Sequence, residues 1–193
     1  MKNITASLLH TAWTEEEKLQ LDRTINFVEE YDGRDFLTVA CQYLYRILNI
    51  DHIHLGLIKN KASKEYIYTV VSLYCGQVTS NICYSLNKSP LKHIYDEEFM
   101  YLPFGLSAMY PEYNFLRKKN FESYIGMPLL NADDKPLGIM VLLHSRIIER
   151  GGFVEALINA LVPRIETELS SKQIHHSYSL APSYQSIQKN IML

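Results

Sequence analysis

The sequence predicts an α+β fold in which helices cover both faces of a central sheet. Residues 123–130 and 137–144 are apolar at both alternating sets of positions, which is typical of strands buried on two faces. The polar segment 131–136 between them carries side chains that set turn geometry, so we expect the two strands to form a hairpin. Apolar residues recur at helical spacing before and after this hairpin, and these segments supply the cover that a buried sheet needs.

The first expected helix begins with a capping box, because Glu17 follows Thr14 at the spacing of that motif. Its apolar stripe consists of Leu21, Ile25 and Val28. The other positions are mostly charged, so we expect this helix to lie on a surface or against a partner helix. The full set of expected helices covers residues 14–30, 35–48, 89–95 and 153–172.

The last helix carries the strongest helical signal, an apolar residue every four positions from Phe153 to Leu169. Pro163 lies inside it and removes the hydrogen bond to the Asn159 carbonyl, so we expect a kink. The expected strands form a second series, and the segment 104–120 between two of them lacks clean periodicity. The expected strands cover residues 53–57, 66–75, 82–86, 99–102, 123–130 and 137–144, with a turn at 76–81.

The run SYIGMPLLNADDKPLGIMVLLH at 123–144, with Tyr110-Pro111-Glu112 before it and an amphipathic helix after it, resembles the C-terminal half of a GAF domain. The resemblance extends over residues 34–171. It implies a GAF/PAS-like central six-stranded antiparallel sheet between helical layers, a small-molecule pocket on one face and a regulatory role. It also implies that residues 104–120 are the variable lid over this pocket. Residues 1–33 are then an N-terminal flanking or dimerisation helix, and residues 172–193 are a C-terminal linker or tail.

Composition excludes several classes of protein. The 193 residues are 47% hydrophobic and 21% charged, as in an ordinary globular domain, and the net charge of −2 gives no general attraction to nucleic acid. No apolar run approaches the ~20 residues that span a bilayer, and the N-terminus lacks the apolar core of a signal peptide. We therefore expect a cytoplasmic protein with no membrane partner and reduced thiols at Cys41, Cys75 and Cys83.

Aromatic side chains crowd into the lid and the strands beside it. Tyrosine offers an apolar face with a polar tip, which suits a mostly apolar cavity that has a few directional hydrogen bonds. The alternative is an aromatic core under a long loop, and Ser123 either caps the backbone or contacts ligand. The candidate ligand-binding residues are Cys83, Tyr84, Tyr95, Phe104, Tyr110, Tyr113, Ser123 and Tyr124.

One enzymatic activity has to be considered, because some GAF-like proteins reduce free methionine sulfoxide with paired cysteines. Cys83 lies near the first of the required positions, but the second falls near His93, and nothing in 89–95 can resolve a sulfenic acid. We therefore expect no enzyme. Cys75 and Cys83 flank a turn and could face each other as a redox pair, although two reduced thiols are the simpler interpretation.

Other ligand classes have weaker signals. Asn87-Lys88 and Asp96-Glu97 match part of the cyclic-nucleotide signature of GAF domains, but Lys92 stands where that signature has phenylalanine. His52 and His54 share one strand face without a third metal ligand near in sequence, and His54 is expected on the exposed side. His93 could be a haem ligand, and His175-His176 lie in the tail. Cys83 is the sole cysteine that a tetrapyrrole could use, and no histidine follows it, so we expect no cofactor and no metal.

The sequence therefore predicts a small-molecule-binding sensory or regulatory GAF-like domain in a signal transduction system, which acts on an effector domain or partner protein. Narrow apolar stripes on the first and last helices indicate a homodimer through the terminal helices, unless both stripes only cover one sheet face of a monomer. The second hypothesis is a ligand-free structural dimerisation module. The third is a thiol-dependent, methionine sulfoxide reductase-like enzyme.

Overall fold

The computed structural model describes residues 12–61, 64–86 and 99–178, and side chains as far as residue 172. In this part of the chain, one antiparallel sheet has the strand order β3-β2-β1-β7-β6-β5, and the short β4 pairs with β2 on the same edge as β3. The strands are β1 His52–Lys61, β2 Lys64–Tyr74, β3 Gln77–Val78, β4 Cys83–Ser85, β5 Met100–Leu102, β6 Ser123–Leu130 and β7 Pro136–His144. The predicted α+β class with an antiparallel sheet is confirmed. β3 is an addition, because residues 76–81 were expected to be a turn.

The predicted hairpin is the centre of this sheet. β6 and β7 pair from Ser123 opposite His144 to Leu130 opposite Pro136, and β7 also pairs with β1. Nearly all side chains of both strands are buried, as expected for strands covered on two faces. At the turn, the Asn131 side chain accepts hydrogen bonds from the backbone N–H groups of Asp133 and Lys135, both 2.9 Å long.

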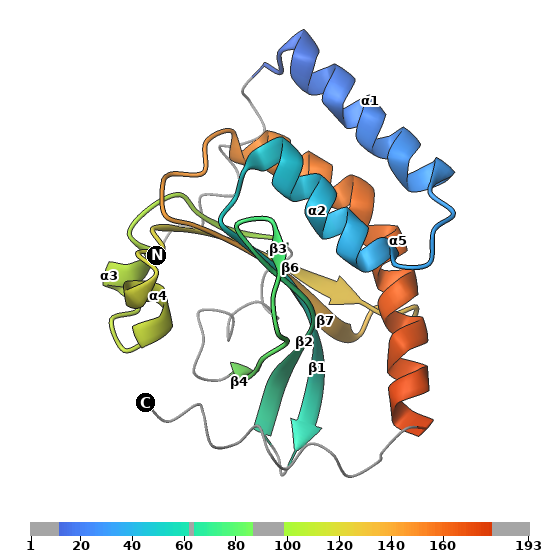
Figure 1. The fold of residues 1–193 in the computed structure, drawn as a ribbon, viewed down its shortest axis with the longest axis vertical. Helices are drawn as coiled ribbons and strands as arrows, with labels where there is room; N and C mark the ends of the chain where they lie inside the picture. Colours follow the sequence, from blue (N-terminus) through green and yellow to red (C-terminus); the bar gives the residue numbers. More distant parts are fainter. Residues whose placement is uncertain (1–11, 62–63, 87–98, 179–193) are drawn as a thin grey trace.

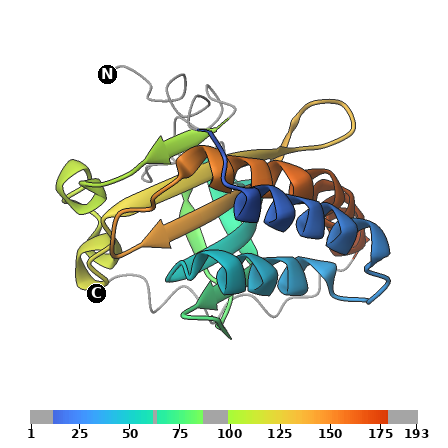
Figure 2. The same ribbon diagram turned by 90° about the horizontal axis from the view of Figure 1, so that it is seen from above.

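Three long helices cover one face of the sheet, which we call the helix face (Figure 1). They are α1 Glu15–Glu30, α2 Phe36–Leu48 and α5 Gly151–Tyr178. Aliphatic side chains of β1, β2, β6 and β7 pack against α2 and α5 in one large core, to which β1 contributes Ile53, Leu55 and Leu57. Viewed from above, α1 lies beside α2 and α5 as an outer helix rather than directly on the sheet (Figure 2).

α1 begins as predicted, because the Thr14 side chain and the Glu17 backbone and side chain form a complete capping box. Its buried stripe differs from the prediction. Ile25 is 41% exposed, whereas Thr24 is fully buried and its hydroxyl lies 3.1 Å from that of Tyr43 on α2. The hydroxyl of Thr24 has partners at this interface, and this is why a polar residue occupies the position that the apolar pattern assigned to its neighbour.

α5 changes direction midway along its length (Figure 1), near the position of Pro163 inside the helix. This agrees with the predicted kink, since proline cannot donate to the preceding turn. Beyond the proline, Arg164 stabilises the contact with α1 by donating to the Val28 carbonyl at 2.5 Å. The helix extends to Tyr178, beyond its expected end at 172, and the assignment of residues 172–193 as a tail stays a prediction.

Two short helices lie on the opposite side of the sheet (Figure 1), which we call the lid face. α3 Leu106–Met109 and α4 Asn114–Lys118 replace the aperiodic lid expected over 104–120. A second core lies beneath them, built from Leu106, Leu116, Phe121 and Tyr124 with Ile139 and Val141 of β7. In the described parts of the chain, no helix has the length and apolar character needed to span a bilayer.

Candidate functional site

Two histidines lie buried in the middle of the sheet on the lid face. His52 and His54 alternate along β1 with Ile53 and Leu55, so they point away from the helix face. Their exposed fractions are only 5% and 4%. The expectation that His54 lies on the exposed side of its strand is therefore wrong, because this face of β1 is covered and the side chains of His52 and Tyr84 lie against His54.

The two imidazoles form a hydrogen-bonded chain with a tyrosine. His52 Nε2 lies 3.1 Å from His54 Nδ1, and His54 Nε2 lies 2.8 Å from the Tyr84 hydroxyl. Tyr84 reaches this position because β4 pairs with β2, with Tyr84 opposite Ile67 of the lid-face core. We call His52, His54 and Tyr84 the histidine–tyrosine chain.

Burial controls the protonation of this chain. Desolvation, and then the positive charge of Lys119, lowers the pKa of His52 to about 4. Desolvation, with a smaller effect of His52, lowers the pKa of His54 well below its usual value. Burial, followed by the influence of Cys83, raises the pKa of Tyr84. Both imidazoles are therefore neutral and the phenol keeps its proton near neutral pH.

Aromatic rings surround the free end of the chain. The His52 ring centroid lies 5.9 Å from that of Phe115 on α4, 6.1 Å from that of Phe121 and 6.3 Å from that of Tyr74. Lys119 stands at the rim, with its ammonium 4.0 Å from the Tyr74 ring centroid. His52 Nδ1 is buried and has no hydrogen-bond partner in the described structure. The site thus presents one unmet polar atom in an apolar, aromatic setting with a cation at its edge.

Comparison with solved structures identifies the architecture. No protein-family model matches the sequence, and no curated protein matches it. The structure superimposes on the GAF domain of an Acinetobacter phosphoenolpyruvate-protein phosphotransferase with a TM-score of 0.61 and 12% identity, over 86% of this chain and 99% of that one. The fold is that of a GAF domain.

Other GAF-type structures match equally well. Free methionine-R-sulfoxide reductase from Neisseria meningitidis has a TM-score of 0.61 and 11% identity, over 86% of this chain and 98% of that one. The chromophore-binding domain of a Stigmatella aurantiaca bacteriophytochrome has a TM-score of 0.61 and 8% identity, over 81% of this chain but only 60% of that one. At these identities the likeness establishes the GAF fold, and the chemistry has to be read from the residues of this chain.

The GAF fold brings four of the sequence-predicted site residues into the lid-face core. Tyr124 is buried there, and Tyr84, Tyr110 and Tyr113 are partly buried and pack against the core; the ring centroids of Tyr110 and Tyr113 lie 6.0 Å apart. Tyr124 lies so close over Gly126 that a Cβ at that position would collide with the tyrosine ring. These tyrosines belong to the same side of the sheet as His52.

Three other candidates lie elsewhere. Ser123 is on the opposite side of β6 from Tyr124 and donates to the Arg146 carbonyl at 2.6 Å, so it braces the backbone. Cys83 alternates with Tyr84 on β4, which turns its side chain away from the lid-face core. Phe104 is 65% exposed and lines a different hollow.

Tyr95 lies outside the described residues, as do His93 and the nucleotide-signature residues within 87–98.

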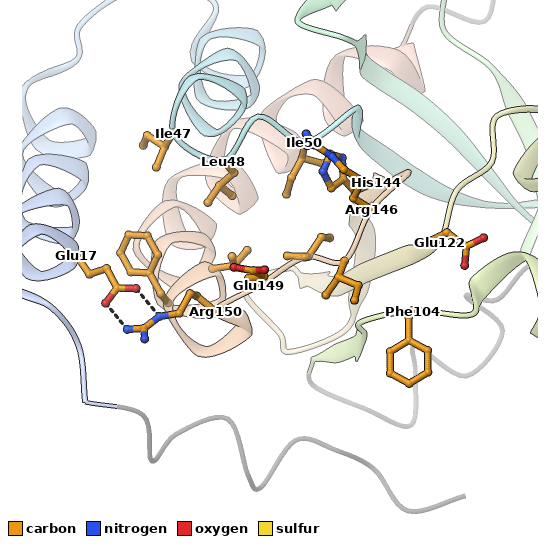
Figure 3. Close-up of a pocket in the computed structure, with 14 residues that line it drawn as sticks. Glu17, Ile47, Leu48, Ile50, Phe104, Glu122, His144, Arg146, Glu149 and Arg150 are labelled. Atoms are coloured by element: carbon orange, nitrogen blue, oxygen red, sulfur yellow. Dashed lines mark hydrogen bonds and ion pairs between the residues drawn. The ribbon is translucent and has the colours of Figure 1, made fainter.

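The hollow that contains Phe104 is a groove of about 830 Å³ where α1, α2 and the β7–α5 connection meet. Figure 3 shows Glu17 of α1 facing Arg150 at one side of it and Phe104 at the other. Arg150 donates from Nε to Glu17 at 2.7 Å and also from its terminal nitrogen. Ile147, 57% exposed, and Ile148 contribute apolar surface. This ion pair fastens the start of α1 to the start of α5.

The alternative in which Cys75 and Cys83 face each other as a redox pair does not fit the structure. Cys83 is opposite Tyr68, whereas Cys75 follows Tyr74 at the far end of β2, so roughly seven strand residues of ~3.3 Å separate their levels. Such a distance far exceeds the ~4.5 Å between the Cβ atoms of a disulfide. Cys41, Cys75 and Cys83 are free. In the described part of the chain, no three potential metal ligands lie together, and the side chains of His175 and His176 are outside that part.

Sequence reasoning missed the contribution of His52, Phe115 and Lys119 to this site. A usable signal was present, since a His-x-His pattern within an apolar strand places both rings on one face. If that face is covered, both imidazoles are buried and must find hydrogen-bond partners. The pattern was instead considered only as an incomplete metal site.

Proposed function

We propose that this chain is a small-molecule-binding sensory or regulatory GAF domain whose ligand lies against the histidine–tyrosine chain under α3 and α4. The observation that carries the proposal is the buried, unpartnered Nδ1 of His52. A buried polar atom without a partner costs ~1–3 kcal/mol, so a fold that keeps one has a reason to do so, and a ligand group that satisfies it is the simplest.

The hydrogen bonds around the lid offer a route from this site to α5. The lid ends at Phe121, and from there the Glu122 N–H donates to the His144 carbonyl at 2.8 Å. Ser123 donates to Arg146, and the Tyr101 hydroxyl donates to the Ile148 carbonyl. These acceptors belong to the connection that leads directly into α5. A ligand that displaces α4 would shift Phe121 and, through these bonds, the start of α5.

Two fold neighbours are consistent with ligand binding in this architecture. One is described as a chromophore-binding domain, and the other was solved in complex with its substrate. For the present chain we propose binding without catalysis, because Cys75 and Cys83 lie at distant levels of the sheet and Cys41 is buried in α2.

Two exposed phenylalanines supply a matched test. Phe115, 45% exposed, contacts His52, whereas Phe104 lies in the groove on the other side of the connection. We expect native mass spectrometry of freshly purified protein to show a small-molecule adduct that is lost in Phe115→Asp and kept in Phe104→Asp. The proposal fails if no adduct is present and a fragment library containing acids, bases and neutral compounds causes no NMR shift in residues of the lid face.

We also propose that the chain forms a homodimer through its terminal helices. Leu19 and Ile25 of α1 are 49% and 41% exposed, which leaves apolar surface on the outer helix after α1 has packed on α5. The same native mass spectra report the oligomeric state. We expect a dimer that dissociates in the double variant Leu19→Glu/Ile25→Glu, and a monomeric wild-type protein would contradict this.

A further inference from the structure

We propose that the ligand of the lid face is an organic acid with an apolar body, and that its carboxylate accepts a hydrogen bond from the Nδ1–H group of His52. This inference rests on the proposed function, since it assigns a chemical class to the ligand of that site. It follows from the order of protons along the histidine–tyrosine chain and from the charge and rings around its open end.

The order of protons is set at Tyr84. Its side chain is partly buried against the lid-face core, its hydroxyl lies 2.8 Å from His54 Nε2, and burial raises the pKa of the phenol so that it keeps its proton. A buried phenol must place its proton on an acceptor, so Tyr84 donates to Nε2 of His54. Because His54 is a neutral imidazole, its one proton is then on Nδ1, which donates to Nε2 of His52. His52 is neutral for the same reason, so its proton is on Nδ1.

The opposite order of protons leaves one more polar group without a hydrogen bond. If His52 Nε2 donated to His54 and His54 donated to Tyr84, the phenol proton would have no acceptor, and His52 Nδ1 would still be unpartnered as a bare lone pair. The first order leaves only one unmet group, the Nδ1–H of His52. The free protein therefore holds a hydrogen-bond donor at the end of its chain, which matches a ligand group that accepts.

The positive charge beside His52 favours a ligand whose hydrogen-bond acceptor is an anion. Lys119 is the charged group whose field acts on His52, and it is positive. Its ammonium lies over Tyr74, one of the rings in contact with His52. An N–H donor beside a cation favours a carboxylate over an amide or an amine. Phe115 and Phe121 offer ring surface for the remainder of the molecule, which accordingly is apolar.

The first test needs no ligand. Nitrogen-15 NMR of the full chain with labelled histidine distinguishes the two neutral tautomers at each ring near neutral pH. We expect His52 and His54 both to carry the proton on Nδ1. In Tyr84→Phe we expect the other tautomers to appear as well, because the variant removes the phenol proton that fixes the order. A His52 proton on Nε2 in the wild-type chain would overturn the inference whatever binds to the site.

The second test compares two probes that share a phenyl ring and differ in charge, phenylacetate and 2-phenylethylamine. We expect phenylacetate to bind at least about tenfold more tightly, the ratio expected from one charge-assisted hydrogen bond, and to shift the Nδ1 resonance of His52. His52→Phe, which keeps an aromatic ring, should abolish this preference. Lys119→Gln should weaken the binding of phenylacetate by about two- to threefold, as expected for an exposed charge at the rim of a site. Lys118→Gln, at the neighbouring position, should leave this affinity unchanged.

The outcomes separate this inference from the proposed function. If the amine binds as tightly as the acid, or if neither probe binds while other fragments shift lid-face residues, the site remains and the ligand class is wrong. If phenylacetate binds His52→Phe and wild-type protein equally well, the carboxylate does not contact His52 and the inference is also wrong. Thermal unfolding of each variant verifies that a lost preference does not arise from an unfolded protein.

Discussion

The two faces of the sheet are made by the same strands, but the side chains that β1 contributes to them differ in chemistry. On the helix face, β1 contributes Ile53, Leu55 and Leu57 to a core that is aliphatic along the whole strand. On the lid face, the same strand contributes two imidazoles that need partners and leave one nitrogen without any. Burial stabilises the first face directly, whereas the second gives up stability to keep a polar group inside. This difference is consistent with our proposal that the helix face holds the fold and the lid face binds the ligand.

The helix face should respond most strongly to truncation. Leu55 is fully buried among the residues that join the sheet to α2 and α5, so Leu55→Ala removes packed methyl groups and leaves a cavity. We expect it to lower the free energy of unfolding by about 2–5 kcal/mol in urea denaturation. Val78→Ala on the exposed edge strand β3 is the control, with an expected change within about 0.5 kcal/mol. Equal losses at the two sites would contradict this account of the helix face.

Acid should destabilise the protein through the lid face. Folding lowers the pKa of His52 from 6.5 to about 4, so the unfolded chain takes up a proton that the folded protein refuses as the pH falls between these values. Stability from His52 is therefore fully present above pH 6.5 and is lost toward pH 4, by about 3 kcal/mol in total. His54, whose pKa is also lowered, acts in the same direction.

Urea denaturation at a series of pH values from about 7 to 5 measures this loss before the carboxylates, with ordinary pKa values of about 4, begin to contribute. We expect stability to fall steadily over that range in the wild-type protein and to fall less steeply in His52→Phe. A pH-independent free energy of unfolding would mean that the imidazoles are solvated, and the contrast between the two faces would disappear.

Breaking the histidine–tyrosine chain should show that its members act as a unit. His54→Leu leaves the Tyr84 hydroxyl and His52 Nε2 without partners, and each unmet buried group costs about 1–3 kcal/mol. The triple variant His52→Phe/His54→Leu/Tyr84→Phe removes the polar groups together, so we expect it to be more stable than the single variant. A triple variant whose loss equals or exceeds the sum of the single losses would show that the chain stabilises the fold rather than serving binding.

The parts of this molecule that were predictable are those encoded locally. The hairpin could be predicted because 123–130 and 137–144 are apolar on both sides of a turn whose Asn131 bonds its own backbone. The capping box of Thr14 and Glu17 is also a contact within one turn of chain, and it forms as expected. In both cases the residues that decide the structure are neighbours in sequence, so the pattern contains the information.

The site could not be predicted in the same way, because it depends on how strands that are far apart in the sequence pair with each other. Tyr84 meets His54 only through the register of β4 on β2, and a shift of one residue would have turned Cys83 toward the histidines instead. His54 was expected to be exposed because the alternation in β1 resembles that of a half-buried strand. Instead it is buried against His52 and Tyr84. His52 in turn lies against Phe115 of α4, and the aperiodic sequence of this segment gives no indication of where it packs.

The smallest effect expected concerns the ion pair at the rim of the helix face. Glu17→Gln keeps a side chain that can complete the capping box with Thr14, so it isolates the contact with Arg150. Burial opposes ionisation of Glu17, but hydrogen bonds from Thr14 and Arg150 outweigh it and lower the pKa of the carboxyl, so this contribution is present above the ordinary pKa and is lost in acid. We expect a loss of about 0.2–1 kcal/mol at neutral pH, measured by urea denaturation.

Salt gives the control for this variant. The Arg150 side chain is partly exposed, so the difference between Glu17→Gln and wild-type protein should shrink in about 1 M salt, where the screening length is only ~3 Å. Thr14→Ala, which removes the hydroxyl from the capping box, should lose about 1 kcal/mol at any salt concentration. A large and salt-insensitive loss in Glu17→Gln would place a strong polar interaction on the helix face. The assignment of polar chemistry to the lid face would then no longer hold.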